Sequence, residues 1–172
     1  MAPPLNVVLV NSKSDEPFND EHRRLIAKIS PLCYTYNYHL VLVNFRIDDS
    51  PTDFAREMAT STSIGKGGER LIELAKKGKI KITKLPLSED LGKIVICTSK
   101  PDKTKSENPK NIFALSKKRK IALIFGCDKK RNKNIRNLLQ KADYHLDISC
   151  KGIQLSVDAE MGAVTSIINN LE

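Results

Sequence analysis

The chain has 172 residues, of which 40% are hydrophobic and 28% charged, and this is enough for a single domain, 1–172, with a sizeable core. No apolar run approaches the roughly 20 residues of a membrane span. The first residues lack the pattern of a secretory signal, so we expect a cytoplasmic protein. The cysteines Cys33, Cys97, Cys127 and Cys150 form no C-x-x-C pair, and the three histidines are scattered. These spacings favour reduced cysteines and exclude the usual zinc sites.

The net charge of +9 is distributed unevenly along the chain. Residues 1–60 hold 6 Lys/Arg and 8 Asp/Glu, residues 61–151 hold 23 and 9, and residues 152–172 hold 0 and 3. The excess of +14 in the middle segment (23 − 9) favours a polyanionic partner, with nucleic acid the leading one. The alternative is an ordinary solvated lysine-rich surface. An aromatic content of 5% argues against a surface that stacks many bases.

Short β-branched runs alternate with amphipathic segments through the first half of the chain. The expected order is a strand at 5–10, a helix at 18–36, a strand at 39–43, helices at 51–59 and 69–77, and a strand at 80–83. Asn19 is a suitable N-cap for the first long helix. Gly78 is suited to ending the third helix.

The second half continues the alternation. The expected order is a strand at 93–97, a long loop at 99–111, a helix at 112–118, a strand at 120–126, a helix at 132–141, a strand at 144–148 and a closing helix at 157–171. In the closing helix, Met161, Val164, Ile167, Ile168 and Leu171 are expected to face inward. Alternating strands and helices indicate an α/β domain, a mostly parallel sheet with helices on both faces.

The glycine-rich segment 65–68 resembles a phosphate loop but fails its pattern. Thr60 stands where the first glycine belongs, and Gly67 follows Lys66 in place of Ser or Thr. A plain flexible loop is one interpretation. The other is that Lys66 contacts an RNA phosphate or a cofactor. The first strand ends without a glycine-rich turn, which argues against a dinucleotide site of the Rossmann type.

The ends of three strands in the second half carry a family resemblance. Residues 93–97 run into Thr98-Ser99, residues 121–126 end in Gly126, and residues 144–148 lead to Leu155-Ser156-Val157-Asp158-Ala159. This succession resembles the knotted core of SPOUT RNA methyltransferases, especially the ribose-methylating branch, and looks closest to an uncharacterised archaeal branch. The resemblance spans nearly the whole chain, because the run 19–43 is similar to that family's first helix and second strand.

The resemblance implies a C-terminal trefoil knot, S-adenosylmethionine as cofactor and RNA, either tRNA or rRNA, as substrate. The implied cofactor-binding residues are Thr98, Ser99, Gly126, Leu146, Ile148, Gln154, Leu155 and Val157. Lys28 falls where the family keeps a catalytic arginine, with Arg23 and Arg24 as rivals in register. Basic residues expected to face RNA phosphates are Lys66, Lys117, Lys118, Arg119, Lys129, Lys130 and Arg131. The resemblance also implies a homodimer formed through the closing helix, where Gly162 and Ala163 are small.

Two family motifs are incomplete in this sequence. The segment after Gly126 lacks the usual Glu and second Gly, and the segment 154–157 lacks the usual Asn. Three functions therefore stay open: an RNA methyltransferase, with a ribose 2′-oxygen favoured over a base nitrogen, an inactive RNA-binding protein of the same fold, and another α/β enzyme acting on a small anion. The simpler alternatives at the sites are core packing for the apolar residues and solvation for the lysines.

Overall fold

The computed structural model describes residues 3, 5–13, 16–60, 67–127 and 131–171. Its strands form one sheet of six in the order β3-β2-β1-β5-β4-β6, and every pairing is parallel. The strands are β1 (Asn6–Val10), β2 (His39–Val43), β3 (Ile80–Thr83), β4 (Lys93–Cys97), β5 (Ile121–Gly126) and β6 (Tyr144–Leu146). The predicted α/β class and parallel sheet are confirmed, and β6 is shorter than expected.

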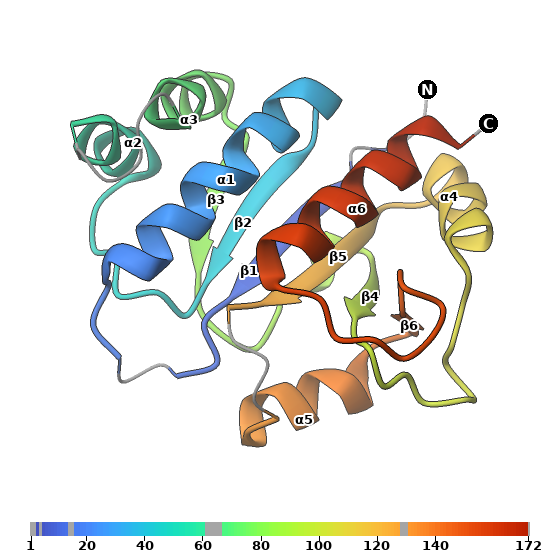
Figure 1. Ribbon diagram of the computed structural model, residues 1–172. Helices are drawn as coiled ribbons and strands as arrows, with labels where there is room; N and C mark the ends of the chain where they lie inside the picture. Colours follow the sequence, from blue (N-terminus) through green and yellow to red (C-terminus); the bar gives the residue numbers. More distant parts are fainter. Residues whose placement is uncertain (1–2, 4, 14–15, 61–66, 128–130, 172) are drawn as a thin grey trace.

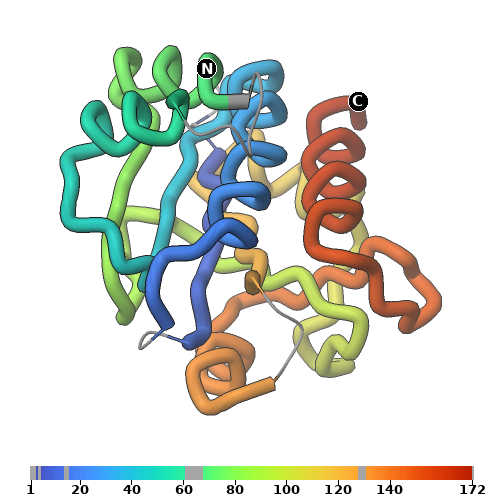
Figure 2. Tube along the Cα trace, turned by 60° about the vertical axis from the view of Figure 1, so that its left-hand side comes forward, coloured from blue at the N-terminus to red at the C-terminus, as the bar shows by residue number. Residues whose placement is uncertain are grey.

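Helices cover the two faces of the sheet unequally (Figures 1 and 2). The helices are α1 (Asp20–Tyr36), α2 (Pro51–Ala59), α3 (Gly67–Lys76), α4 (Pro109–Lys118), α5 (Lys133–Lys141) and α6 (Val157–Asn170), with a 3-10 turn η1 (Glu89–Leu91). One face carries α1 with α3 and α6 against it, α2 beside α3, and α4 beside α6. The opposite face is covered by α5 and by the apolar residues of the segment around η1.

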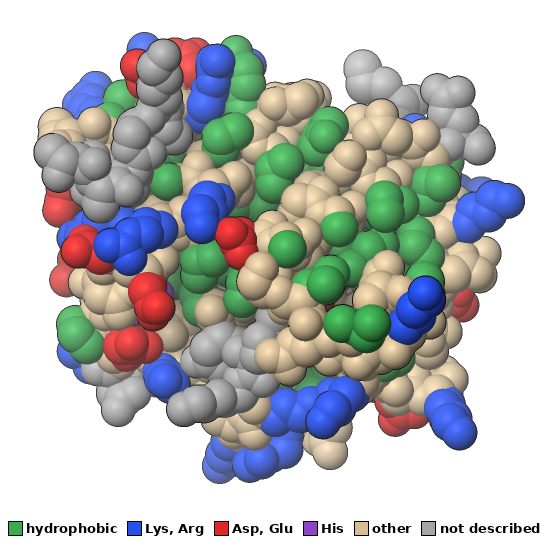
Figure 3. Space-filling view, in the orientation of Figure 1, with side chains coloured by type: hydrophobic (Ala, Val, Ile, Leu, Met, Phe, Trp, Pro, Cys, Tyr) green, Lys and Arg blue, Asp and Glu red, His purple; other side chains and the backbone are tan. Residues whose placement is uncertain are grey.

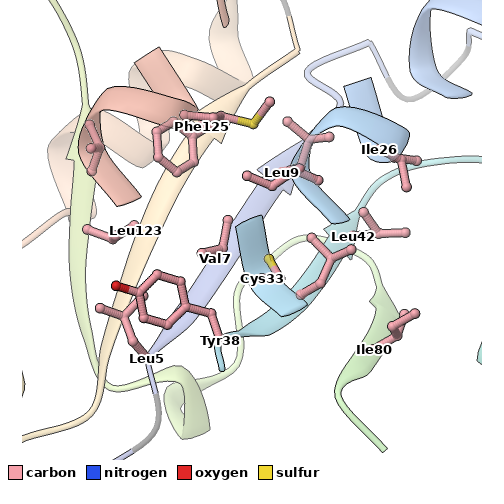
Figure 4. Packing of buried hydrophobic residues seen from close by; sticks show 14 of the residues in the cluster. Leu5, Val7, Leu9, Ile26, Cys33, Tyr38, Leu42, Ile80, Leu123 and Phe125 are labelled. Carbon is pink, nitrogen blue, oxygen red and sulfur yellow. The ribbon is translucent and has the colours of Figure 1, made fainter. Parts of the chain in front are cut away.

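The central strand β1 explains why the sheet is buried on both faces. Successive side chains of a strand point to opposite faces. Val7 and Leu9 pack in the cluster under α1 and α6, whereas Val8 and Val10 pack in the cluster under α5. Figure 4 shows Val7 and Leu9 among residues from α1, β2 and β5. A strand buried on both sides is mostly apolar, and the exception in β1 is the buried Asn6, whose side-chain amide donates to the Leu91 carbonyl at 3.2 Å.

Local sequence signals set the ends of the helices as expected. Asn19 caps α1, since its side-chain oxygen accepts a hydrogen bond from the His22 amide at 3.0 Å. Gly78 ends the turn after α3 with φ +67°, a conformation that glycine adopts without strain. One expectation is wrong: Ile167 of α6 is 39% exposed instead of facing inward. In the described parts of the chain no helix has the length and apolar character needed to cross a membrane.

Candidate functional site

The loops after β4, β5 and β6 meet at the carboxyl edge of the sheet and enclose a cavity. Parallel strands place their carboxyl ends at one edge, where ligands commonly bind in open α/β sheets. Residues from all three loops and from α5 line this carboxyl-edge cavity: Ile96, Cys97, Thr98, Ser99, Lys100, Gly126, Arg131, Ile135, Leu139 and Gln154. The lining combines an apolar wall from β4 and α5 with hydroxyl, amide and cationic groups.

Arg131 joins two of these loops. Its guanidinium donates to the Lys100 carbonyl at 2.9 Å and to the Thr98 hydroxyl at 3.3 Å. Its own carbonyl accepts from the Arg136 guanidinium of α5 at 2.9 Å. Arg131 is therefore a cation at the mouth of the cavity, held by contacts to loop and helix.

The loop after β6 is shaped by two polar side chains. The Asp147 carboxylate accepts hydrogen bonds from the Ser149 hydroxyl at 2.6 Å and from the Gly152 amide at 2.8 Å. The Ser149 hydroxyl oxygen in turn accepts from the amides of Lys151 and Ile153. These bonds curl the loop toward the loop after β4, where a Cβ on Gly152 would stand 3.6 Å from the Ser99 carbonyl oxygen.

The long loop after β4 is tied to α5 and β6. The Asp102 amide donates to His145 Nδ1 at 3.0 Å, while His145 Nε2 lies 2.8 Å from the Leu139 carbonyl. Lys105 Nζ donates to the carbonyls of Leu139, Gln140 and Ala142 at the end of α5. A cation at a helix C-terminus satisfies carbonyls that have no partner within the helix. His145 therefore links the long loop after β4 to α5.

A second cavity, of about 380 Å³, lies between α1 and the start of α6. We call it the α1–α6 cavity, and it is lined by Asn11, Lys13, Glu16, Glu21, His22, Arg24, Leu25, Lys28, Cys127, Val157 and Asp158. Lys28 Nζ donates to Asp158 Oδ2 at 3.0 Å. This hydrogen bond holds the pKa of the Asp158 carboxyl below its ordinary value. Burial lowers the pKa of His22, although Glu16 and Glu21 oppose the shift.

The two cavities share walls. Gly126 lines the carboxyl-edge cavity, and the next residue, Cys127, lines the α1–α6 cavity. Likewise, Gln154 lines the carboxyl-edge cavity and Val157 lines the α1–α6 cavity. The loop after β5 and the entry into α6 therefore separate a mixed apolar and polar cavity from a charged one.

The structure brings together half of the predicted cofactor residues. Thr98, Ser99, Gly126 and Gln154 line the carboxyl-edge cavity. The Leu146 side chain is fully buried. The Leu146 carbonyl accepts a hydrogen bond from the Thr98 amide, at the start of the loop after β4, at 2.9 Å. The other three lie elsewhere: Ile148 packs against the core, Leu155 is half-buried, and Val157 lines the α1–α6 cavity.

The predicted basic residues separate into distinct places. Arg24 and Lys28 share the α1–α6 cavity, whereas Arg23 pairs with Asp20 and lies over the Phe18 ring. Lys117, Lys118 and Arg119 are exposed at the end of α4, which leads to the amino edge of the sheet. Lys66, Lys129 and Lys130 lie outside the described residues.

Sequence reasoning missed several residues of the site. Asp158, the partner of Lys28, is 130 positions away in the chain, and its only local signal is an acidic side chain in the first turn of α6. Lys100 and the apolar wall residues Ile135 and Leu139 were also missed as lining residues. Within the described residues no group of three His, Cys, Asp or Glu could hold a metal ion, and none of the four cysteines forms a disulfide.

Several solved structures with a similar fold are described as methylase family proteins, a methyltransferase or a tRNA modifying enzyme. A probable methylase family protein from Haemophilus influenzae Rd KW20 aligns with a TM-score of 0.61 at 15% identity, over 96% of this chain and 64% of that one. The SpoU methyltransferase AviRb from Streptomyces viridochromogenes, solved with AdoMet, aligns with a TM-score of 0.54 at 11% identity, over 98% and 58%. The TrmH/SpoU tRNA modifying enzyme of A. aeolicus aligns with a TM-score of 0.54 at 15% identity, over 96% and 73%. This chain spans less than two thirds of the first two proteins.

The fold is thus that of the SpoU and TrmH proteins, and the predicted resemblance to SPOUT methyltransferases is confirmed at the level of the fold. The chain belongs to the family described as "Protein of unknown function (DUF531)", which matches residues 5–169. It is also 28% identical to an uncharacterized protein of the archaeon Methanocaldococcus jannaschii over 164 residues, 95% of this chain and 92% of that protein.

Proposed function

We propose that this protein is an S-adenosylmethionine-dependent RNA methyltransferase. The observation that supports this proposal best is the shared wall between the two cavities. Methyl transfer needs a donor and an acceptor held side by side, since a misplaced acceptor loses most of the gain from proximity. The carboxyl-edge cavity suits the donor, and the adjoining α1–α6 cavity, with Arg24 and Lys28, suits an RNA nucleotide.

The residues of the carboxyl-edge cavity fit the cofactor by their chemistry. Ile96, Ile135 and Leu139 offer an apolar wall for the adenine, and Thr98 and Gln154 offer hydrogen bonds. The carboxylate of the cofactor would lie toward Arg131 or Lys100. The cavity encloses about 120 Å³, which is small for a whole ligand of this size, so part of the bound cofactor would extend beyond it. When bound, S-adenosylmethionine supplies an electrophilic methyl group on its sulfonium.

Lys28 is proposed to hold and orient the acceptor nucleotide. Its ammonium is shared with Asp158, so in this arrangement it is charged and able to donate to a phosphate or a ribose oxygen. The pair is partly exposed, at 56% for Lys28 and 39% for Asp158, so an incoming RNA can reach both groups. Removal of the acceptor proton falls to the Asp158 carboxylate, whose pKa is held below its ordinary value by the hydrogen bond from Lys28.

The finer parts of the proposal rest on the family resemblance. We propose tRNA or rRNA as substrate, with a ribose 2′-oxygen favoured over a base nitrogen, a single cytoplasmic domain and a C-terminal knot. We further propose a homodimer through α6. The exposed Ile153 and Ile167 and the half-buried Gly162 support an apolar contact there. Figure 3 shows hydrophobic side chains gathered over α6 and toward α4.

The first test is a calorimetric titration of the protein with S-adenosylmethionine. We expect saturable binding at one site per chain. The loaded protein is then incubated with total tRNA and rRNA and cofactor labelled on the methyl group, and label is expected in RNA. Absence of binding at millimolar cofactor would contradict the proposal.

The second test separates an enzyme from an inactive RNA-binding protein of the same fold. Lys28→Met should lower the rate of methyl transfer by about 100-fold or more, which corresponds to about 2.7 kcal/mol in the barrier. Cofactor affinity should stay unchanged, because Lys28 does not line the carboxyl-edge cavity. Lys28→Arg, which keeps the charge, should retain more activity. Cofactor and RNA binding without any turnover in the wild-type protein would favour the inactive alternative, in keeping with its incomplete family motifs.

A further inference from the structure

A third cavity, of about 370 Å³, lies at the opposite edge of the sheet, where the strands begin. We call it the amino-edge cavity. Its lining comes from the ends of α1, α4 and α6 and the starts of β1, β2 and β3: Pro3, Leu5, Tyr36, Asn37, Tyr38, His39, Lys79, Phe113, Ser116, Lys117, Ile168 and Asn169. Figure 1 shows these helix ends together beside the N-terminus. Each strand has three to six residues, so this cavity lies roughly 20 Å from the carboxyl-edge site.

The charge at the amino-edge cavity is strongly positive. Lys79 and Lys117 line it, and the described lining residues include no Asp or Glu. Lys79, Lys81 and Lys120 all help to lower the pKa of His39, after burial as the main cause. Burial is the main cause that lowers the pKa of Lys79, and the charge of Lys77 lowers it further.

The carboxyl ends of α1, α4 and α6 lie beside these lysines and attract cations. Lys79 and Lys117 line the cavity itself, and its described lining residues offer no carboxylate to pair with them. Two cations that face one cavity without a carboxylate favour an external anion there.

The chemistry of the lining narrows the kind of anion. Lys79 Nζ donates to the Asn37 side chain, and this bond holds its amine at the cavity. Lys117 Nζ lies 4.8 Å from the centre of the Phe113 ring. The rings of Tyr36 and Phe113 add apolar surface beside the amines. Amines next to ring surfaces suit a phosphate attached to a sugar or base better than a free inorganic ion.

We infer that the amino-edge cavity binds the phosphate backbone of the RNA substrate, at a place remote from the nucleotide that is methylated. This inference rests on the proposed function, since it names a second contact for the same RNA. A site about 20 Å from the reacting nucleotide can recognise the substrate without entering the chemistry. Its role is to raise the affinity for RNA, and each neutralised phosphate adds to the salt dependence of binding.

The test is the salt dependence of binding to a fluorescently labelled tRNA transcript between 50 and 200 mM salt. Affinity for RNA falls as salt rises, so the slope of log affinity against log salt is negative. In the double variant K79M/K117M this slope should be less steep than in wild type by about 1.4 to 1.8, which is 0.7 to 0.9 for each lost contact. Lys117→Met alone should make it less steep by about half as much, and this exposed position keeps the test valid if Lys79 affects folding. The matched control K84M/K110M removes two exposed lysines outside the cavity and tests the effect of charge alone.

The outcomes separate this inference from the proposed function. If K79M/K117M and K84M/K110M change the slope equally, the amino-edge cavity is not an RNA site, although the methyltransferase proposal stands. If the wild-type protein binds no tRNA or rRNA at 50 mM salt, both proposals fail. Calorimetry with S-adenosylmethionine should give equal affinities for wild type and both double variants, because neither pair lines the carboxyl-edge cavity.

Discussion

The two edges of the sheet are built in different ways. At the amino edge the connections are minimal: only residues 37–38, 77–79, 119–120 and 142–143 link a helix to the next strand. At the carboxyl edge the loops are longer and are held by side chains such as Asp147, Lys105 and Arg131. Backbone geometry therefore fixes the amino edge, whereas side-chain hydrogen bonds fix the carboxyl edge.

This contrast indicates where each edge is sensitive to mutation. Turns of two or three residues cannot adjust to a change in backbone conformation, so such changes at the amino edge should lower the free energy of unfolding. Lys79 donates to Asn37 in the 37–38 turn, whereas Lys117 is exposed on α4, so removal of Lys117 should affect binding and leave the fold intact. At the carboxyl edge, a lost side-chain bond should disturb the site first.

The largest expected effect comes from Gly92, at the start of β4. It has φ +86°, and a Cβ there would stand 2.2 Å from the Lys120 carbonyl oxygen. Gly92→Ala should lower the free energy of unfolding by about 3 kcal/mol, because backbone strain and overpacking add. The measurement is urea denaturation followed by circular dichroism.

Gly78 provides the matched control at the same edge. It has φ +67° with nothing within 4 Å of an added Cβ, so Gly78→Ala adds strain without a clash. A loss of about 1 kcal/mol is expected there. Equal losses in the two variants would show that close backbone contact does not fix the amino edge.

A smaller effect is expected at the carboxyl edge from Lys105→Met. The change removes the charged donor that serves three carbonyls at the end of α5, at a cost of about 2 kcal/mol. Because the same loop carries Thr98 and Ser99, affinity for S-adenosylmethionine should fall as well. Lys103→Met, exposed in that loop, should change neither quantity. Retained cofactor affinity in Lys105→Met would contradict the idea that side-chain bonds shape this site.

The smallest effect is a pH dependence that involves one histidine at each edge. Burial is the main cause that lowers the pKa of His39 at the amino edge and of His22 at the carboxyl edge. Above about pH 6.5 both histidines are neutral in folded and unfolded chains, so neither makes the free energy of unfolding depend on pH. Below pH 6.5 the unfolded chain binds protons first, and the free energy of unfolding falls until the pH passes the lowered pKa of the folded state.

Each histidine can contribute at most about 1.4 kcal/mol per pH unit. Urea titrations between pH 7.5 and 5 should therefore give a shallower decline for His39→Gln and for His22→Gln than for wild type. Lys28 also lowers the pKa of Asp158, and protonation of that carboxyl should reduce the free energy of unfolding only below about pH 4. A wild-type stability that is constant from pH 7.5 to 5 would contradict this account.

Local patterns in the sequence predicted the elements of the fold well. The strand at 39–43 and the helix at 51–59 agree with the structure to the residue, because an apolar β-branched run and a Ser-Pro start are strong local signals. Four of the eight residues that the resemblance implied for the cofactor, Thr98, Ser99, Gly126 and Gln154, line one cavity. The ordering of the 99–111 loop by His145 and Lys105 was not predictable, since it depends on contacts with residues more than 30 positions away.

The pair Lys28–Asp158 shows the same limit. Its two residues lie on α1 and α6 and meet only because the two halves of the sheet join at β1 and β5. Exposure of Ile167 was missed for a related reason. An apolar face can be read from spacing, but how far a neighbouring helix covers it depends on packing across the chain.

The junction of β1 with β5 has a consequence for how the protein is made. Residue 10 ends β1, and its second partner begins only at residue 121. At 5 to 20 residues per second, the ribosome needs roughly 6 to 22 seconds to add the 110 residues between them. During that time β1 can pair with β2 but offers an open apolar edge, the kind of surface that templates aggregation. Chaperone demand should therefore be greatest before β5 emerges, and a chain truncated ahead of residue 121 should be the least soluble product of this sequence.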